Sequence, residues 1–150
     1  MNVFELGHPD VAHAVDRPLP APDNTSSEFW AAVARGSLLF QRCPACGHAQ
    51  FYPRPLCVRC AAEPEWEEAS GEGKVHTFTV IRQNLAPPFG GLGAYVVAMI
   101  DLVEGPRMMS NVTHVDPAEV RIGLPVTCYG VKVDDGLGLP FWRPSTGGAR

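Results

Sequence analysis

The chain has few basic residues and no long apolar run. Its 12 Lys and Arg residues are outnumbered by 16 Asp and Glu, which gives a formal net charge of -4, and Lys74 and Lys132 are its only lysines. Nucleic-acid-binding proteins usually carry a basic surplus that neutralises phosphates, so this balance argues against an RNA or DNA partner. No segment approaches the roughly eighteen consecutive apolar residues of a membrane-spanning helix, which excludes such a span.

Common catalytic motifs are also missing. There is no Gly-x-Ser-x-Gly motif, and residues 91–93 (Gly-Leu-Gly) lack the third glycine of a dinucleotide-binding loop. Cys128 lies in a predicted strand, where we expect a buried apolar thiol and not an exposed, activated nucleophile. His76 and His114 have no partner visible in the sequence. A free-standing enzyme that uses one of these three residues is therefore the weakest functional hypothesis, and we expect no catalysis by the chain alone.

The most informative pattern in the sequence is the spacing of its cysteines. Four of the 5 cysteines follow the spacing C-x2-C-x10-C-x2-C, namely Cys43, Cys46, Cys57 and Cys60. Each C-x-x-C pair supplies two thiolates from one turn of the backbone, and four soft sulfurs are the ligand set that tetrahedral zinc prefers. Because four protein thiolates leave no position open for water or substrate, the pattern predicts a structural Zn2+.

Other arrangements of these cysteines fit less well. A redox dithiol at Cys43 and Cys46 would leave the second pair unexplained. Two disulfides would suit a secreted chain, but residues 1–5 show no basic segment followed by an apolar run, as a signal peptide would. His48 is a spare ligand, although four cysteines are already in register. We expect a zinc-thiolate site and a cytoplasmic location.

Glycine and proline shape the rest of the chain. With 15 of each, turns should be many and helices few, so the fold is expected to be mainly β. Residues 1–24 are rich in proline and have no apolar periodicity, which predicts an extended arm.

One short helix follows the arm. Residues 25–28 (Thr-Ser-Ser-Glu) fit a capping box with Thr25 as the N-cap, and Gly36 can end the helix in the left-handed conformation. Phe29 and Trp30 are adjacent, so both cannot face one core. Local packing on two sides of the helix is the simpler explanation, and contact of one of the two with a partner protein or with the ribbon is the alternative, for which Trp30 is the candidate.

The cysteine-containing segment reads as a ribbon of two short β-arms. Residues 37–42 and 49–53 are the predicted strands, and Gly47 stands where the backbone of the first pair needs a positive φ. So small a unit buries little surface, and metal binding should supply most of its folding energy. Residues 61–73 read as an acidic connector. Residues 25–69 are thus expected to form a domain that joins the helix to a four-cysteine zinc ribbon.

A five-stranded OB-fold barrel is predicted for residues 70–144, leaving residues 145–150 as a flexible tail. A short helix at residues 116–120 separates the third and fourth strands, which is the OB-fold order, and the loop at 84–93 would border the ligand face. Five strand candidates support this order: residues 74–83, 94–103, 107–113, 125–133 and 139–143. The expected fold is therefore an N-terminal helix and rubredoxin-like zinc ribbon followed by this barrel.

Several short motifs follow the ribbon in a specific order: residues 70–75 (Ser-Gly-Glu-Gly-Lys-Val), 95–98 (Tyr-Val-Val-Ala), 123–126 (Gly-Leu-Pro-Val) and 141–144 (Phe-Trp-Arg-Pro). With the cysteine spacing, this order resembles the zinc-ribbon plus OB-fold proteins of acyl-CoA metabolism, long catalogued as a domain of unknown function. The resemblance covers residues 28–144. It implies an accessory subunit that holds a thiolase-fold enzyme and borders the acyl-CoA site in thiolytic, condensing or retro-aldol chemistry, including steroid side-chain and fatty or aromatic acid degradation.

The resemblance also implies partners and ligands. The complex would bind a coenzyme A thioester, two copies of the chain would flank a partner dimer, and a hot-dog-fold hydratase is a further partner class. Arg42, Arg54 and Arg59 either neutralise the zinc-thiolate centre or face coenzyme A phosphates, for which guanidinium groups are suited. Phe89, on the loop at 84–93, is a candidate lid residue. The alternative function is an OB-fold module that binds single-stranded nucleic acid.

Overall fold

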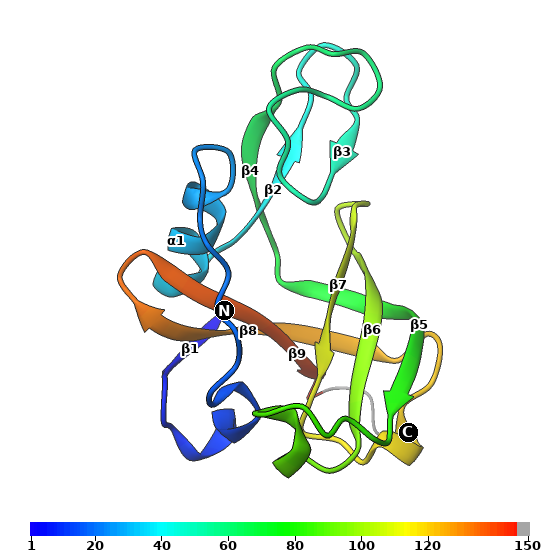
Figure 1. Cartoon of the computed structure of the whole chain (residues 1–150). Helices are drawn as coiled ribbons and strands as arrows, with labels where there is room; N and C mark the ends of the chain where they lie inside the picture. Colours follow the sequence, from blue (N-terminus) through cyan, green and yellow to red (C-terminus); the bar gives the residue numbers. More distant parts are fainter. Residues whose placement is uncertain (147–150) are drawn as a thin grey trace.

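The computed structural model describes residues 1–146, which form a mainly β fold with two sheets and a single α-helix (Figure 1). Of the predicted tail at 145–150, residues 147–150 lie outside the described residues. No helix within residues 1–146 has the length and apolar character needed to cross a membrane.

The smaller sheet carries the ribbon. Strand β2 (Leu38–Arg42) lies at its centre, between β3 (Ala49–Gln50) and β4 (Glu65–Ala69). The prediction that residues 61–73 are only a connector was wrong, because β4 pairs antiparallel with β2 along its whole length. The strand was hidden by its acidic sequence, in which Trp66 and Ala69 are the only apolar residues.

The larger sheet closes into the predicted five-stranded OB-fold barrel. Strand β8 pairs with β5 on one side and with β9 on the other, and β7 meets β9 at a single pair. The order around the barrel is β5, β6, β7, β9, β8. The five strands are β5 (Glu72–Ile81), β6 (Tyr95–Leu102), β7 (Arg107–Val112), β8 (Pro125–Asp134) and β9 (Leu137–Pro144).

The connections of the barrel follow the sequence signals. The predicted short helix is a 3-10 turn, η3 (Pro117–Glu119), and the Asp116 carboxylate accepts a hydrogen bond from the Ala118 N–H at 2.8 Å. A second 3-10 turn, η2 (Phe89–Gly91), lies in the loop between β5 and β6.

Residues 1–24 are more ordered than an extended arm. They begin with β1 (Asn2–Glu5), which pairs in parallel with residues 129–132 of β8, and continue with the 3-10 helix η1 (Pro9–Ala14). Strand β5 pairs only with residues 125–127 of β8, so the remaining edge of β8 is open to β1. The prediction of a purely extended arm was therefore wrong, because proline content gave no sign of this parallel pairing.

Helix α1 (Ser27–Arg35) ends at Gly36 with φ of 92°, as predicted. Its start differs from the expected capping box. Ser26 is the N-cap and its side chain makes no capping hydrogen bond, whereas the Asp23 carboxylate accepts hydrogen bonds from the N–H groups of Thr25 at 3.0 Å and Ser26 at 2.8 Å in the turn before the helix.

Glycines allow α1 to lie directly on the barrel. A Cβ atom at Gly138 of β9 would be 2.3 Å from the Ala34 nitrogen, and one at Gly130 of β8 would be 2.8 Å from the Val33 carbonyl oxygen. Both distances are shorter than the closest approach of two non-bonded heavy atoms, so only glycine fits at these positions. The helix backbone therefore packs against the sheet without intervening side chains.

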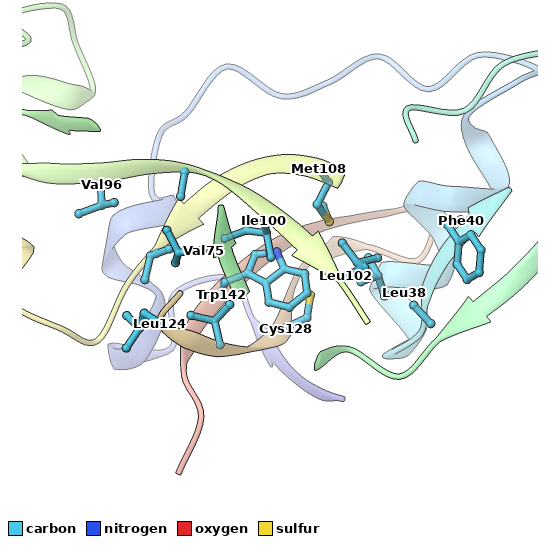
Figure 2. Packing of buried hydrophobic residues seen from close by; sticks show 14 of the residues in the cluster. Leu38, Phe40, Val75, Val96, Ile100, Leu102, Met108, Leu124, Cys128 and Trp142 are labelled. Atoms are coloured by element: carbon cyan, nitrogen blue, oxygen red, sulfur yellow. The ribbon is translucent and has the colours of Figure 1, made fainter. Parts of the chain in front are cut away.

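One apolar core joins the ribbon, the helix and the barrel. Figure 2 shows Trp142 of β9 beside Ile100 and Cys128 inside the barrel, with Leu38 and Phe40 of β2 continuing the cluster. Trp142 and Phe40 are both 0% exposed. The ribbon is thus anchored to the barrel by buried side chains as well as by the peptide chain.

Candidate functional site

The four predicted ligands come together at the tip of the ribbon. Their sulfur atoms all lie within 4.8 Å of one another, with Cys43 to Cys60 at 3.4 Å and Cys46 to Cys57 at 3.7 Å. A tetrahedron with Zn–S bonds of about 2.3 Å has sulfur–sulfur edges of about 3.8 Å. The set fits zinc, excludes His48, and leaves no open position, as a structural site requires.

The two cysteine turns share one backbone geometry. The Cys43 carbonyl accepts a hydrogen bond from the Gly47 N–H at 2.8 Å, and the Cys57 carbonyl accepts one from the Ala61 N–H at 2.9 Å. Gly47 has φ of 73° and Ala61 has φ of 61°, so the predicted positive φ at Gly47 is confirmed and recurs at a non-glycine residue. Each turn therefore presents its cysteine pair in the same way.

A buried glutamine pair supports the second turn. Gln50 Nε2 donates to Gln41 Oε1 at 2.9 Å, and Gln50 Oε1 accepts from the Val58 N–H at 3.0 Å. Gln41 in turn accepts from the Arg54 N–H at 2.8 Å and donates to the Arg54 carbonyl at 2.9 Å. The segment that leads into Cys57 is thus fixed to β2 and β3 by side-chain amides.

The three ribbon arginines have different surroundings. Arg42 forms an ion pair with Glu67, with Nε to Oε2 at 2.6 Å, and this carboxylate raises the pKa of the Arg42 guanidinium. Arg54 and Arg59 are exposed, and no carboxylate in residues 1–146 forms an ion pair with either. Among the three, these two have guanidinium groups without a counter-charge in the described part of the chain.

Arg54 lines a cleft of about 340 Å3 between the ribbon and the hairpin that joins β6 to β7. His48 and Arg107 line the same cleft. Arg107 Nε donates to Asp101 Oδ1 at 2.5 Å, and the other oxygen of Asp101 lies 3.0 Å from His76 Nδ1. His76 therefore has a partner that the sequence did not reveal.

Cys128 is a core residue. Its thiol is 1% exposed, and burial raises its pKa well above the ordinary value. A thiol in this state is a weak nucleophile. The expectation of a buried apolar thiol is confirmed.

Arg17 is the most connected residue that sequence reasoning missed. Its Nε donates to the His13 carbonyl at 2.6 Å, and its Nη1 donates to Asn111 Oδ1 of β7 at 2.6 Å. The guanidinium lies 5.6 Å from the Phe89 ring centre and 5.1 Å from that of Phe141. Arg17 thus joins the N-terminal segment to the loop at 84–93 and to the barrel.

A polar chain runs beside Arg17. His13 Nε2 lies 2.6 Å from the Tyr129 hydroxyl, which lies 2.7 Å from Thr113 Oγ1, and His114 Nδ1 lies 2.9 Å from the same Thr113 oxygen. Burial, with a smaller contribution from the charge of Arg17, lowers the pKa of His13 to about 4. Burial raises the pKa of Tyr129. Both side chains are therefore neutral near pH 7.

Trp30 and Phe89, the two aromatic residues proposed from the sequence as contact residues, have different surroundings. Trp30 is partly buried between the apolar core described above and a second apolar cluster that includes Val11 and Tyr129, and its indole Nε1 is buried with no hydrogen-bond acceptor among residues 1–146. Phe89 stacks on Tyr95, with ring centres 5.9 Å apart. Spacing alone gives no signal for this cluster, because Arg17 and Asn111 lie 94 positions apart in the sequence.

Comparison with known proteins identifies both halves of the chain. Residues 30–67 match the family described as the ChsH2 rubredoxin-like zinc ribbon domain, and residues 66–130 match the ChsH2 C-terminal OB-fold domain. A solved chain titled Ltp2-ChsH2(DUF35) aldolase superposes with a TM-score of 0.73 at 32% identity, covering 83% of this chain and 98% of that one.

Curated relatives agree with this result. A DUF35 domain-containing scaffold protein of Methanocaldococcus jannaschii is 36% identical over 69% of this chain and 77% of its own length. A probable enoyl-CoA hydratase alpha subunit of Thermomonospora curvata is 34% identical over 86% of this chain, but the match spans only 40% of that longer protein. The chain therefore belongs to the DUF35 family of proteins that join a ChsH2-type zinc ribbon to an OB-fold barrel.

Proposed function

We propose that the chain is a non-catalytic accessory subunit of an acyl-CoA enzyme. The observation that carries this proposal is the match, over 98% of its length, to a solved chain described as an Ltp2-ChsH2(DUF35) aldolase. The names of the relatives in the preceding comparison, a scaffold protein and a hydratase alpha subunit, are in keeping with it. The closed cysteine site supports a positioning role, because four thiolates leave zinc no position for substrate.

The partner we propose is a thiolase-fold enzyme that supplies the reacting groups for thiolytic, condensing or retro-aldol chemistry. Two copies of the chain would flank a partner dimer, because soluble oligomers favour two-fold symmetry. A hot-dog-fold hydratase is the second partner class. Reduced zinc thiolates suit a cytoplasmic complex.

The ribbon offers the contacts that we propose for the coenzyme A thioester. Arg54 and Arg59 are exposed and free of carboxylate partners within residues 1–146, so either can pair with a phosphate without first breaking an ion pair. Arg42 is already paired with Glu67 and is the weaker candidate. Trp30 and Phe89 supply apolar surface near the entrance in this proposal.

Co-expression with the product of the neighbouring open reading frame, which this proposal expects to be a thiolase-fold enzyme, tests the proposal. We expect the two proteins to co-elute in size-exclusion chromatography and the complex to turn over acyl-CoA, whereas the isolated chain does not. An isolated chain that binds single-stranded oligonucleotide with a steep salt dependence and ignores the enzyme would support the nucleic-acid alternative instead.

A further inference from the structure

A groove of about 540 Å3 lies on the outside of the barrel where β7 and β9 separate. These strands share only the pairing of Val112 with Trp142, so the sheet opens on either side of it. Residues 17–20, in the segment that passes along the barrel between η1 and α1 (Figure 1), form one wall. The size falls within the range of small-molecule sites, about 300–1,000 Å3.

The walls of the groove are mainly apolar. Aromatic, aliphatic and thioether side chains reach it from the N-terminal segment, helix α1 and three barrel strands. They include Leu19, Trp30, Val97, Met109, Leu139 and Phe141. Such a lining favours the apolar body of a ligand, and the methionine adapts to different shapes.

Arg17 is the only charged residue among those that line the groove. Its Nε and Nη1 donate to neutral oxygens of His13 and Asn111, and no acceptor for Nη2 occurs within residues 1–146. No carboxylate in the same residues forms an ion pair with it. A partly buried guanidinium between two aromatic rings thus lacks a counter-charge, which an anionic oxygen would supply.

The charge of the site limits the ligand. His13, the neighbouring titratable group, has its pKa lowered to about 4 by burial and then by Arg17, so it adds no charge near pH 7. One guanidinium balances one negative charge, and its planar fork matches the two oxygens of a carboxylate. A dianionic phosphate would be left undercompensated in these apolar surroundings.

We propose that this groove binds a small amphipathic carboxylate, with its apolar body against Trp30, Met109 and Phe141 and its carboxylate oxygens on Arg17. The site is built entirely within this chain. Binding would occur without a partner enzyme or coenzyme A, so it can be tested independently of the accessory function proposed above, although Trp30 takes part in both proposals.

Isothermal titration calorimetry of the zinc-loaded chain with decanoate tests the site. Decanol, which lacks the charge, and inorganic phosphate, which lacks the apolar body, are the matched probes. We expect saturable decanoate binding that is at least about tenfold tighter than decanol binding, because a charged hydrogen-bonded pair adds to the apolar contacts. Equal affinity for decanoate and decanol, or no saturable decanoate binding, would overturn the proposal.

The Arg17→Gln variant separates this site from any other apolar surface. It should lose the preference for decanoate while keeping decanol binding, whereas Arg35→Gln, at an exposed arginine paired with Glu28, should behave as wild type. NMR shift changes should map to β7 and β9, and the dispersion of the variant spectrum checks that it remains folded. If Arg17→Gln disorders the N-terminal segment, Arg17→Lys keeps the charge and should retain part of the preference. An unchanged decanoate affinity in Arg17→Gln, or shifts confined to the ribbon, would refute the assignment.

Discussion

The side-chain amide of Gln50 donates a hydrogen bond to the side-chain oxygen of Gln41 at 2.9 Å, and both residues are 5% exposed. Together they bind the backbone N–H groups of Arg54, which precedes Cys57, and of Val58, which follows it directly. The geometry of the second cysteine pair therefore depends on two uncharged residues that do not touch the metal.

Gln50→Ala should speed zinc release. The change leaves the Val58 N–H without its side-chain acceptor and removes the buried hydrogen bond to Gln41, and supporting residues around metal ligands change affinity by about 10–100-fold. The rate of zinc transfer to a chromogenic chelator measures the effect. Gln83→Ala, at an exposed glutamine after β5, is the control, and equal rates for the two variants would contradict the supporting role.

Removing zinc should unfold the tip of the ribbon before the barrel. Four thiolates without a cation repel one another, and the segment from Cys43 to Ala62 has few buried apolar side chains of its own. Hydrogen exchange after chelation should show lost protection in this segment and retained protection in β5 to β9. Uniform loss across the chain would show that the shared core, and not the metal, controls the order of unfolding.

Gly138→Ala should destabilise the fold by about 1–3 kcal/mol or more, since the new Cβ would lie 2.3 Å from the Ala34 nitrogen and force α1 away from β9. Thermal unfolding measures the change. Gly91→Ala is the matched control, because nothing lies within 4 Å of the added atom there. Similar melting temperatures for both variants would mean that the helix shifts at little cost.

His13 should make stability depend on pH. Its pKa is about 4 in the folded chain and near 6.5 when unfolded, so between these values the unfolded chain binds the extra proton. Stability is therefore full above pH 6.5 and falls as the pH drops toward 4. The full shift corresponds to roughly 3 kcal/mol, and partial exposure reduces it to roughly 1–2 kcal/mol.

Urea unfolding of wild type and His13→Gln at pH 7.5 and pH 5 isolates this contribution, because the zinc site responds to pH equally in both proteins. Wild type should lose about 1 kcal/mol more than the variant over this interval. The same loss in both would place the pH dependence elsewhere.

The sequence signals that worked were local and periodic. The five strand candidates between turn signals matched the five barrel strands, and the spacing from Cys43 to Cys60 predicted the metal cluster. Both signals come from residues that are close together in the sequence, so they can be recognised without knowledge of the tertiary structure.

The elements that escaped prediction depend on distant pairing. Strand β4 is acidic and becomes a strand because β2 offers it an edge, and β1 pairs in parallel with a part of β8 that β5 leaves free. The contacts of Arg17 and His13 with the barrel join residues about a hundred positions apart, for which no spacing rule exists. These elements and contacts are therefore determined by tertiary pairing, which local periodicity does not predict.

One measurement tests the central claim most directly: the affinity of the zinc-loaded chain for the proposed thiolase-fold partner, compared with that of the zinc-stripped chain, with acyl-CoA turnover assayed in each sample. We expect tight association and turnover only with the zinc-loaded chain present, and loss of association when zinc is removed. A chain that remains a monomer beside the partner, or one that turns over acyl-CoA alone, would contradict the role of a positioning subunit.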